Sequence, residues 1–417
     1  MATNITNECP GFGENLKGLI STMFLRRNET SDFHLECEGK RIPCHKIILA
    51  AASPVFKAMI RSRMKESQEE LMEISNFSFD TIITLVRFIY LKDIKKEVKI
   101  EKLLGQVDYF DVLQAADYFQ IPLLKKLCEF SLANGMSKEN VLDCYSIAKK
   151  FNADILLADA KDMIVSCKSD IMKEDGWKKK LVEHPNLMLD LLEVDKNEND
   201  QQVSSTSRYI RRKSYLTSQK TGTLTRKTGF FALFQKKNFS EEVYTDMLFS
   251  FYALYNDRDT GDLAVTIGKT EQMIHLHKSF ALFYSEKFLE KLMQNKVIED
   301  IETDILTFFY TGKIVDYEKK AKNLIELSLE YDIPLIRDWC QASLIRTLNV
   351  DNVLERFIFA SRMDCLELKK RARKMIFVQN KNILKTENWK ELIKENTDIG
   401  FELFMEALGI LQFQNTQ

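Results

Sequence analysis

The chain has 417 residues, of which 45% are hydrophobic and 29% charged, an ordinary composition for a folded protein with room for two to four domains. Lysine and arginine number 60 against 61 acidic residues, so the overall charge gives no reason to expect nucleic acid or a membrane surface as a partner. No secretory signal opens the chain, and no apolar run reaches the ~18 residues of a membrane span. The eight cysteines are scattered without a C-x-x-C pair, which predicts reduced thiols and a cytoplasmic or nuclear protein.

An amphipathic helix is the first predicted element. Its apolar side chains recur at the i, i+3, i+4, i+7, i+8 spacing of a helical stripe. They are Leu16, Leu19, Ile20, Met23 and Phe24. A stripe of this kind either packs on its own domain or forms a dimer contact, and both interpretations stay open.

A strand pair and an interrupted helix come next. Residues 33–37 alternate between apolar and polar side chains, as a half-buried strand requires, and Gly39 then turns the chain into a second short strand. Apolar residues from 47 to 59 indicate a buried helix with a break near Ser53-Pro54. Helical periodicity dominates the rest of this half of the chain.

The middle of the chain, residues 195–239, has the composition of a flexible basic linker. Between Lys196 and Gly229 it has eight basic side chains, which are Lys196, Arg208, Arg211, Arg212, Lys213, Lys220, Arg226 and Lys227. Two narrower interpretations are that Arg211-Arg212-Lys213 serves nuclear import, or that Ser214 is phosphorylated and orders the segment against nearby arginines.

The second half of the chain repeats the first. An apolar stripe at 243–252 after Ser240 predicts a helix, and residues 263–267 alternate as a strand. His45-Lys46 is answered by His277-Lys278, and residues 121–128 by residues 333–340. The stretch between these anchors is shorter in the second copy, which is therefore a trimmed version of the first.

The motifs of the first half, in their order along the chain, resemble a BTB/POZ domain. They are Ser31-Asp32-Phe33, residues 43–50, residues 53–59, Met64-Lys65-Glu66-Ser67, Phe88-Ile89-Tyr90 and Ala115-Ala116-Asp117-Tyr118. The residues from Asn140 to Leu187 are similar to the helical extension of the speckle-type POZ proteins, which is related to the BACK domain. The second copy resembles a divergent BTB domain with a similar tail.

The resemblance implies an α+β, predominantly helical chain with two BTB/POZ-type domains, each followed by a BACK-like helical extension. The implied segments are a first BTB/POZ domain with its N-terminal helix at 1–125, a BACK-like extension at 126–194, the linker at 195–239, a second, divergent BTB/POZ-like domain at 240–345 and a second extension at 346–417.

The resemblance also implies a function, because many BTB proteins of this type are substrate adaptors of cullin-3 ubiquitin ligases. Met64-Lys65-Glu66 matches the family's hydrophobic-x-Glu cullin motif, and Tyr118 and Phe119 are expected to add to that contact. The second copy has Met293-Gln294-Asn295 instead and lacks the glutamate. The expected partners are cullin-3, a second copy of the chain and an unidentified protein substrate. The alternative is a scaffold that self-associates without any ligase.

Two features depart from the family. The Thr-Gly that usually follows the family tyrosine is Leu91-Lys92 in the first copy, whereas Thr311-Gly312 keeps it in the second. No MATH, kelch or zinc-finger region is visible to hold a substrate. We hypothesise that the second copy either took over that role or pairs with the first.

Enzymatic sites find little support in the sequence. Gly268-Lys269-Thr270 ends like a phosphate-binding loop, but Leu263 occupies the place of its first glycine. Gly11-x-Gly13 lacks a third glycine and a preceding strand. His275 and His277 have no cysteine or carboxylate at zinc-finger spacing. We therefore expect no catalytic residues, no cofactor and no metal.

Overall fold

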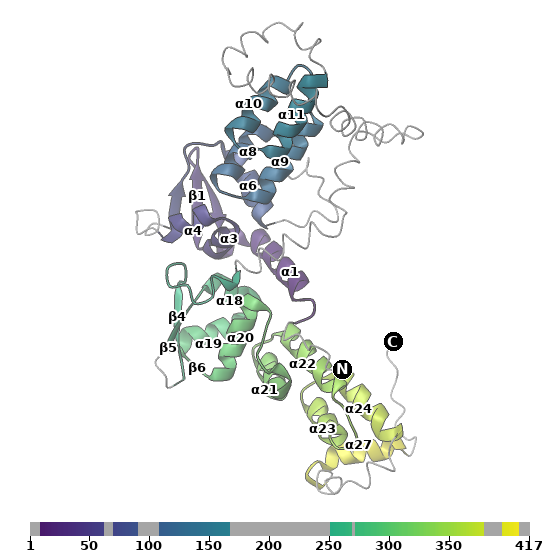
Figure 1. The fold of residues 1–417 in the computed structure, drawn as a ribbon. Coiled ribbons are helices and arrows are strands. Elements are labelled where there is room, and N and C mark those ends of the chain that lie inside the picture. The colour runs from purple at the N-terminus through teal and green to yellow at the C-terminus, as the bar shows by residue number, and fades with distance from the viewer. Residues whose placement is uncertain are drawn as a thin grey trace. The chain divides into compact units, whose positions relative to one another are not determined.

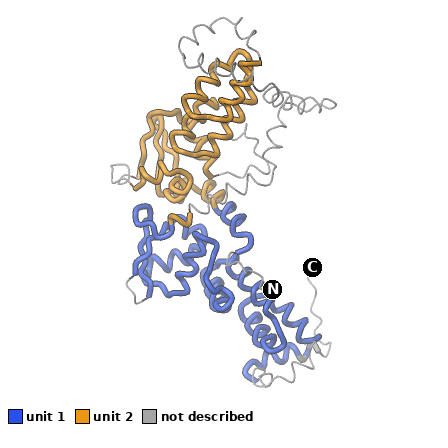
Figure 2. Tube along the Cα trace, viewed as in Figure 1, with its two compact units in different colours: residues 1–19, 255–417 blue, residues 20–254 orange. Residues whose placement is uncertain are grey.

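A computed structural model describes residues 9–61, 70–90, 108–166, 251–268, 272–378 and 394–407. The fold is α+β and mainly helical. Figure 2 shows two compact units, one made of residues 20–254 and the other of residues 1–19 together with 255–417. No helix in the described ranges has the length and apolar character needed to cross a membrane.

The 20–254 unit contains what we call the first module, a three-stranded sheet with its helices (Figure 1). The strand order is β2-β1-β3, with β1 antiparallel to β2 and parallel to β3. Its strands are β1 (Phe33–Cys37), β2 (Lys40–Cys44) and β3 (Leu71–Glu73), and its helices are α2 (Arg27–Thr30), α3 (Lys46–Ala52), α4 (Pro54–Arg61), α6 (Phe79–Tyr90), α8 (Tyr109–Tyr118) and α9 (Pro122–Asn134). The predicted alternation at 33–37 is confirmed, because every second side chain of β1 is buried.

The predicted helix break at Ser53-Pro54 is also confirmed. Ser53 has an extended backbone, so α3 ends at Ala52 and α4 starts at Pro54, where a missing backbone N–H costs no helical hydrogen bond. The Ser53 hydroxyl accepts the backbone N–H of Phe56 at 3.1 Å and donates to the carbonyl of Phe119 at 2.5 Å. The break is therefore satisfied by hydrogen bonds and fixes the direction of α4.

Two helices of the first extension follow this module, α10 (Val141–Lys150) and α11 (Asp154–Ser166). They pack through a small apolar cluster made of Val141, Leu142, Tyr145, Ala160 and Ile164. The remainder of the predicted extension, the basic linker with Ser214 and most of the helix predicted at 243–252 lie outside the described residues.

The other unit contains the second module, whose sheet repeats the topology of the first. Its order is β5-β4-β6, with β4 antiparallel to β5 and parallel to β6. Its elements are β4 (Leu263–Ile267), β5 (Gln272–Leu276), α18 (Lys278–Tyr284), α19 (Glu286–Gln294), β6 (Val297–Ile298), α20 (Asp300–Thr311), α21 (Tyr317–Glu330) and α22 (Pro334–Arg346). The strand predicted at 263–267 is confirmed.

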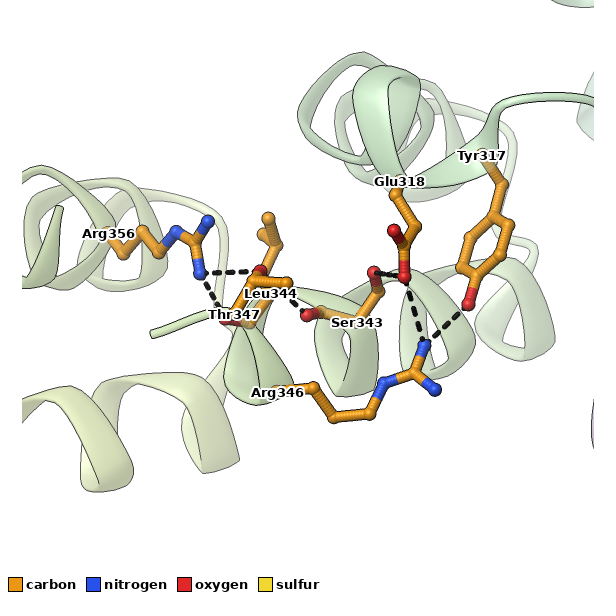
Figure 3. Close-up of polar contacts among 7 residues, drawn as sticks. All are labelled: Tyr317, Glu318, Ser343, Leu344, Arg346, Thr347 and Arg356. Carbon is orange, nitrogen blue, oxygen red and sulfur yellow. Dashed lines mark hydrogen bonds and ion pairs between the residues drawn. The ribbon is translucent and has the colours of Figure 1, made fainter. Parts of the chain in front are cut away.

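The described helices that follow α22, which we call the second extension, are α23 (Val353–Arg362), α24 (Leu366–Val378) and α27 (Thr397–Ala407). Figure 3 shows polar contacts between α21 and α22 of the second module, and those by which Arg356 of α23 joins the end of α22. The Arg346 guanidinium donates to the Tyr317 hydroxyl at 2.5 Å, and Arg356 donates to the hydroxyl of Thr347 at 2.9 Å and to the carbonyl of Leu344. Side chains from α21, α22 and α23 therefore meet at one polar junction.

The N-terminal helix α1 (Phe12–Leu25) is divided between the units after Leu19. Leu16, Ile20, Met23 and Phe24 are buried, and Leu19 is half-buried. In the 20–254 unit, the Phe24 ring lies 5.5 Å from the Tyr90 ring. Most of the predicted apolar stripe is thus already buried within a single chain. A dimer contact through these residues remains a prediction.

The trimming of the second copy falls in two connections. Residues 62–70 join α4 to β3 in the first module, whereas only residues 295–296 join α19 to β6. Residues 91–108 join α6 to α8, whereas residues 312–316 join α20 to α21. The helices and strands on either side of these connections are present in both modules.

Candidate protein-binding face of the first module

The predicted partner-binding residues divide into two groups in the structure. Met64, Lys65 and Glu66 lie outside the described residues, within the connection that follows α4. Tyr118 and Phe119 lie at the end of α8 and are described. The described part of this face therefore consists of the end of α8 and the elements that hold the end of α4.

Tyr118 and Phe119 differ in exposure although they are neighbours and their rings meet edge-on at 5.0 Å. Tyr118 is 46% exposed, whereas Phe119 is 1% exposed. Asp108 caps the start of α8, where its carboxylate accepts the backbone N–H of Phe110 at 2.9 Å. Phe119 follows the last helical residue and precedes Gln120, which has a φ of +51°. The chain reversal at Gln120 leaves one ring on the surface and places the other in the core.

A cluster of four aromatic rings surrounds this helix end. Phe77 lies 5.6 Å from the Tyr118 ring and 5.9 Å from the Phe119 ring, and Phe119 stacks on Phe56 at 4.4 Å. Phe56 belongs to α4, whose last residue is Arg61. The cluster therefore fixes the point from which the chain enters the connection that carries Met64.

An acidic hollow of about 430 Å³ adjoins this cluster at Phe77. It is lined by Glu36, Glu38, Gly39, Glu73, Ile74, Ser75, Asn76, Phe77 and Ser78. Sequence reasoning missed both Phe77 and the hollow. The alternation of β1 was the available signal, because it directs Glu36 away from the core.

The carboxylates of the hollow have different roles. Glu36 pairs with the guanidinium of Arg41, with Oε2 and Nε 2.9 Å apart. Glu38 accepts the backbone N–H of Phe79 at 3.1 Å, at the first turn of α6, where a negative charge is favourable. This face thus offers an exposed tyrosine beside a negatively charged recess, which suits a protein partner with apolar and basic groups.

His45 is a structural group. Its backbone N–H donates to the Tyr90 hydroxyl at 2.8 Å, its Nδ1 lies 2.9 Å from the same oxygen, and its Nε2 lies 3.1 Å from the Thr30 hydroxyl. Burial lowers the pKa of His45 to about 4, so the ring is neutral at physiological pH. This network ties the start of α3 to the end of α6.

The described cysteines are also buried. Burial raises the pKa of the Cys44 and Cys128 thiols, which keeps them protonated and weakly nucleophilic. In the described part of the chain, no three histidine, cysteine or acidic side chains come together as metal ligands. Among the described residues of this module, the exposed Tyr118 ring and the acidic hollow are features that a partner could contact.

Comparisons with known proteins concern the first module. The BTB/POZ domain family model matches residues 22–136. BTB and MATH domain-containing protein 40 of Caenorhabditis elegans is 31% identical over 167 residues, which cover 40% of this chain and 40% of that protein. The chain thus spans two fifths of the length of this curated relative.

Two solved BTB domains are also similar. The BTB domain of human gigaxonin is 26% identical, and the match covers 31% of this chain and 93% of that chain with a TM-score of 0.23. The BTB domain of zebrafish PATZ1 is 18% identical, and the match covers 28% of this chain and 92% of that chain, also with a TM-score of 0.23. The family model and the curated relative show that residues 22–136 form a BTB/POZ domain. BTB/POZ domains are modules through which proteins bind other proteins.

Proposed function

We propose that this protein is a substrate adaptor of a cullin-3 ubiquitin ligase and that its first module binds the cullin. The observation that carries the proposal is the place of Met64-Lys65-Glu66 within the BTB/POZ domain. This motif follows directly from α4, whose end is fixed by the ring cluster beside the exposed Tyr118.

The chemistry of the motif suits an interface. Met64 acts as an apolar anchor that fills a pocket on the partner, and Glu66 fixes orientation through its charge. Tyr118 adds a rigid aromatic surface, which loses little conformational entropy on binding. The BTB and MATH relative supports a protein-binding role of this kind.

We further propose that residues 240–345 are a divergent BTB/POZ-like domain that does not bind the cullin, and that residues 346–417 are its BACK-like extension. The matching strand order supports the first point. The connection that carries the cullin motif shrinks to residues 295–296 in this module, so both the glutamate and the loop that would present it are missing. The second module is then free to hold a substrate or to pair with a first module, and either role places the protein in the cytoplasm or nucleus.

The alternative function is a scaffold that self-associates without a ligase. It is favoured by the second module, because a repeated interaction fold without a cullin motif suits association more than ubiquitin transfer. In that case the first module also serves association, and cullin-3 does not bind.

The test is a direct binding measurement with the full chain and the N-terminal domain of cullin-3. The double variant Met64→Ala, Glu66→Lys is expected to weaken binding about a hundredfold, since it removes the anchor and reverses the charge. Tyr118→Ala is expected to weaken binding about tenfold. Met293→Ala is the matched control, because Met293 is an exposed methionine, 49% accessible, near the end of α19 in the second module.

The outcomes separate the two functions. If the unmodified chain does not bind the cullin domain, the adaptor proposal is wrong and the scaffold remains. If the chain binds and the double variant binds equally well while keeping its fold and oligomeric state, the proposed binding face is wrong. A loss of binding in Met293→Ala would show that the second module takes part after all.

A further inference from the structure

The first residues of the chain belong to the second module's unit. Residues 1–19 group with 255–417, although the whole 20–254 unit separates them in the sequence. Within this unit Cys9 is 3% exposed and Phe12 is 2% exposed. A segment at the start of the chain is thus buried against a module that begins more than half-way along it.

The segment is held by a backbone hydrogen bond and by an aromatic contact. The Cys9 N–H donates to the carbonyl of Gly312 at 2.8 Å, and the Phe12 N–H donates to the carbonyl of Cys9 at 3.2 Å. The Phe12 ring meets the Phe308 ring edge-on at 5.3 Å, and Phe308 stacks on Trp339 at 5.9 Å. The first residue of α1 therefore lies on an aromatic surface formed by α20 and α22.

Gly312 is required at this contact for two reasons. It ends α20 in the left-handed region with a φ of +68°, where a side chain is strained. In addition, a Cβ atom on Gly312 would lie 2.5 Å from the Cγ and Cδ1 atoms of Phe12. In the first module the sequence after Tyr90 is Leu91-Lys92, which supplies no glycine at the corresponding place.

We propose that the second module carries a docking site for a helix whose first residue is aromatic, and that the chain's own N-terminal segment, Cys9–Leu19, occupies it as a tethered ligand. Gly312 selects this ligand because it offers a free carbonyl to the segment's backbone and leaves room for the ring. Tethering raises the effective concentration of the segment, so a contact of modest area stays occupied. The proposal is independent of cullin binding.

The Cys9 thiol reports on docking in the full chain. Burial raises its pKa to about 12, so the docked thiol reacts slowly with an alkylating reagent. In Phe12→Ala, we expect the Cys9 labelling rate, followed by mass spectrometry of its peptide, to rise about tenfold or more. Gly312→Ala is expected to have a similar effect, because the added methyl group displaces the ring.

Two other thiols make the measurement specific. Cys365 is buried in the same unit and Cys128 in the other unit. If only the segment is released, the alkylation of Cys9 becomes faster, whereas the alkylation of Cys365 and Cys128 stays slow. If Cys9 in the unmodified chain reacts as fast as an exposed thiol, or if Phe12→Ala leaves its rate unchanged, the docking proposal is overturned. If Gly312→Ala also raises the alkylation rate of Cys365, that variant has unfolded the module. The Cys9 rate in Phe12→Ala then decides whether the segment is docked.

A fluorescent peptide of residues 7–19 tests the site from the other side. It is expected to bind the full-length Phe12→Ala chain about tenfold more tightly than the unmodified chain, whose own segment competes. It is expected to bind weakly to the Phe12→Ala, Gly312→Val chain, in which the valine side chain blocks the site. Equal binding to all three chains, or to none of them, would contradict the proposal. A peptide with alanine in place of phenylalanine is the matched control.

Discussion

The two modules share a buried hydrogen-bond frame. In the first, the backbone N–H of His45 donates to the Tyr90 hydroxyl at 2.8 Å, and in the second that of His277 donates to the Tyr310 hydroxyl at 3.1 Å. The N–H that follows each histidine donates to a carboxylate, that of Asp32 at 2.7 Å or that of Asp262 at 2.8 Å. In each module these hydrogen bonds lie where the second strand passes into the following helix. The two modules therefore share this part of the fold although most of the surrounding side chains differ.

The outer faces of the two sheets differ in chemistry. In the first module the pairing register places Glu36 between Arg41 and Glu73, a charged row. In the second it places Thr266 between Met273 and Val297, whose side chains are 52% and 48% exposed. The same backbone therefore presents charge in one module and apolar surface in the other, and this argues against one partner for both.

The interiors differ as well. Ile82 and Phe119 are buried in the apolar core of the first module. The corresponding residues of the second are Glu302 and Tyr331, and Lys291 joins them: the Glu302 carboxylate accepts from the Tyr331 hydroxyl at 2.7 Å and from the Lys291 amine. A buried polar group thus replaces apolar packing in the second module. Its contribution to the unfolding free energy can be measured by removing it.

Removing this buried polar group is expected to have the largest effect on stability of the changes considered. Glu302→Ala leaves the buried Tyr331 hydroxyl without its acceptor and also removes the bond from the Glu299 N–H at the start of α20. We expect the second module to lose about 3 kcal/mol of unfolding free energy. Denaturant unfolding followed by hydrogen exchange of β4 and α20 peptides measures this loss.

The control converts the whole group. The triple variant Lys291→Met, Glu302→Ile, Tyr331→Phe reproduces the apolar residues of the first module and is expected to recover most of the lost stability. A triple variant as unstable as Glu302→Ala would mean that the cavity of the second module has a different shape, so that the two interiors are not interchangeable.

Acid is expected to destabilise the first module through His45. Its folded pKa of about 4 lies below its ordinary value of 6.5 because the ring is buried. The neutral ring thus contributes stability that is complete above about pH 6.5 and is lost as the pH falls through about 4, up to about 3 kcal/mol in total. Unfolding free energies of the chain and of His45→Gln, measured between about pH 7 and pH 4, are expected to diverge by that amount. Parallel curves would show that His45 does not titrate in the fold.

The sequence alone predicts much of this comparison. Alternation at 33–37 and 263–267 identifies two central strands, and Ser53-Pro54 identifies the helix break, since these signals are local. The exchange of Ile82 for Glu302 cannot be interpreted from sequence, because the burial of a glutamate depends on Lys291 and Tyr331 arriving from other helices. The contact of Phe12 with Gly312 is equally hidden, since it joins residues that are 300 positions apart in the sequence.

The junction between each module and its extension differs by an arginine. Arg356 donates to the carbonyl of Leu344 and to the Thr347 hydroxyl at the end of α22, whereas Cys144 stands at the corresponding place in the first half. Arg356→Ala is expected to destabilise the second extension by about 1 to 2 kcal/mol, the usual value for hydrogen bonds from a charged donor. Hydrogen exchange of α23 and α24 measures the change.

A surface arginine on the same extension provides the control. Arg371 of α24 forms an exposed ion pair with Glu367, one helical turn earlier, at 2.9 Å. Arg371→Ala is expected to change stability by less than about 0.5 kcal/mol. Similar losses in the two variants would mean that the polar junction of Figure 3 adds no more than an exposed ion pair.

The smallest expected effect concerns one oxygen at a helix start. Glu129 accepts the backbone N–H of Ile155 at 2.8 Å, and Gln341 accepts that of Leu368 at 3.1 Å in the second extension. Burial raises the pKa of Glu129 above its ordinary 4.5, so its stabilising contribution is complete below about pH 4.5 and is lost as the pH rises through the folded pKa. Glu129→Gln is expected to remove this pH dependence, and near pH 7 its unfolding free energy is expected to differ from that of the unmodified chain by less than about 1 kcal/mol.

The reciprocal variant Gln341→Glu is expected to introduce the same pH dependence into the second extension. Hydrogen exchange of the α11 and α24 amides at several pH values measures both effects. If neither exchange profile changes with pH, the two residues are equivalent acceptors, and the difference between the extensions lies in the arginine junction alone.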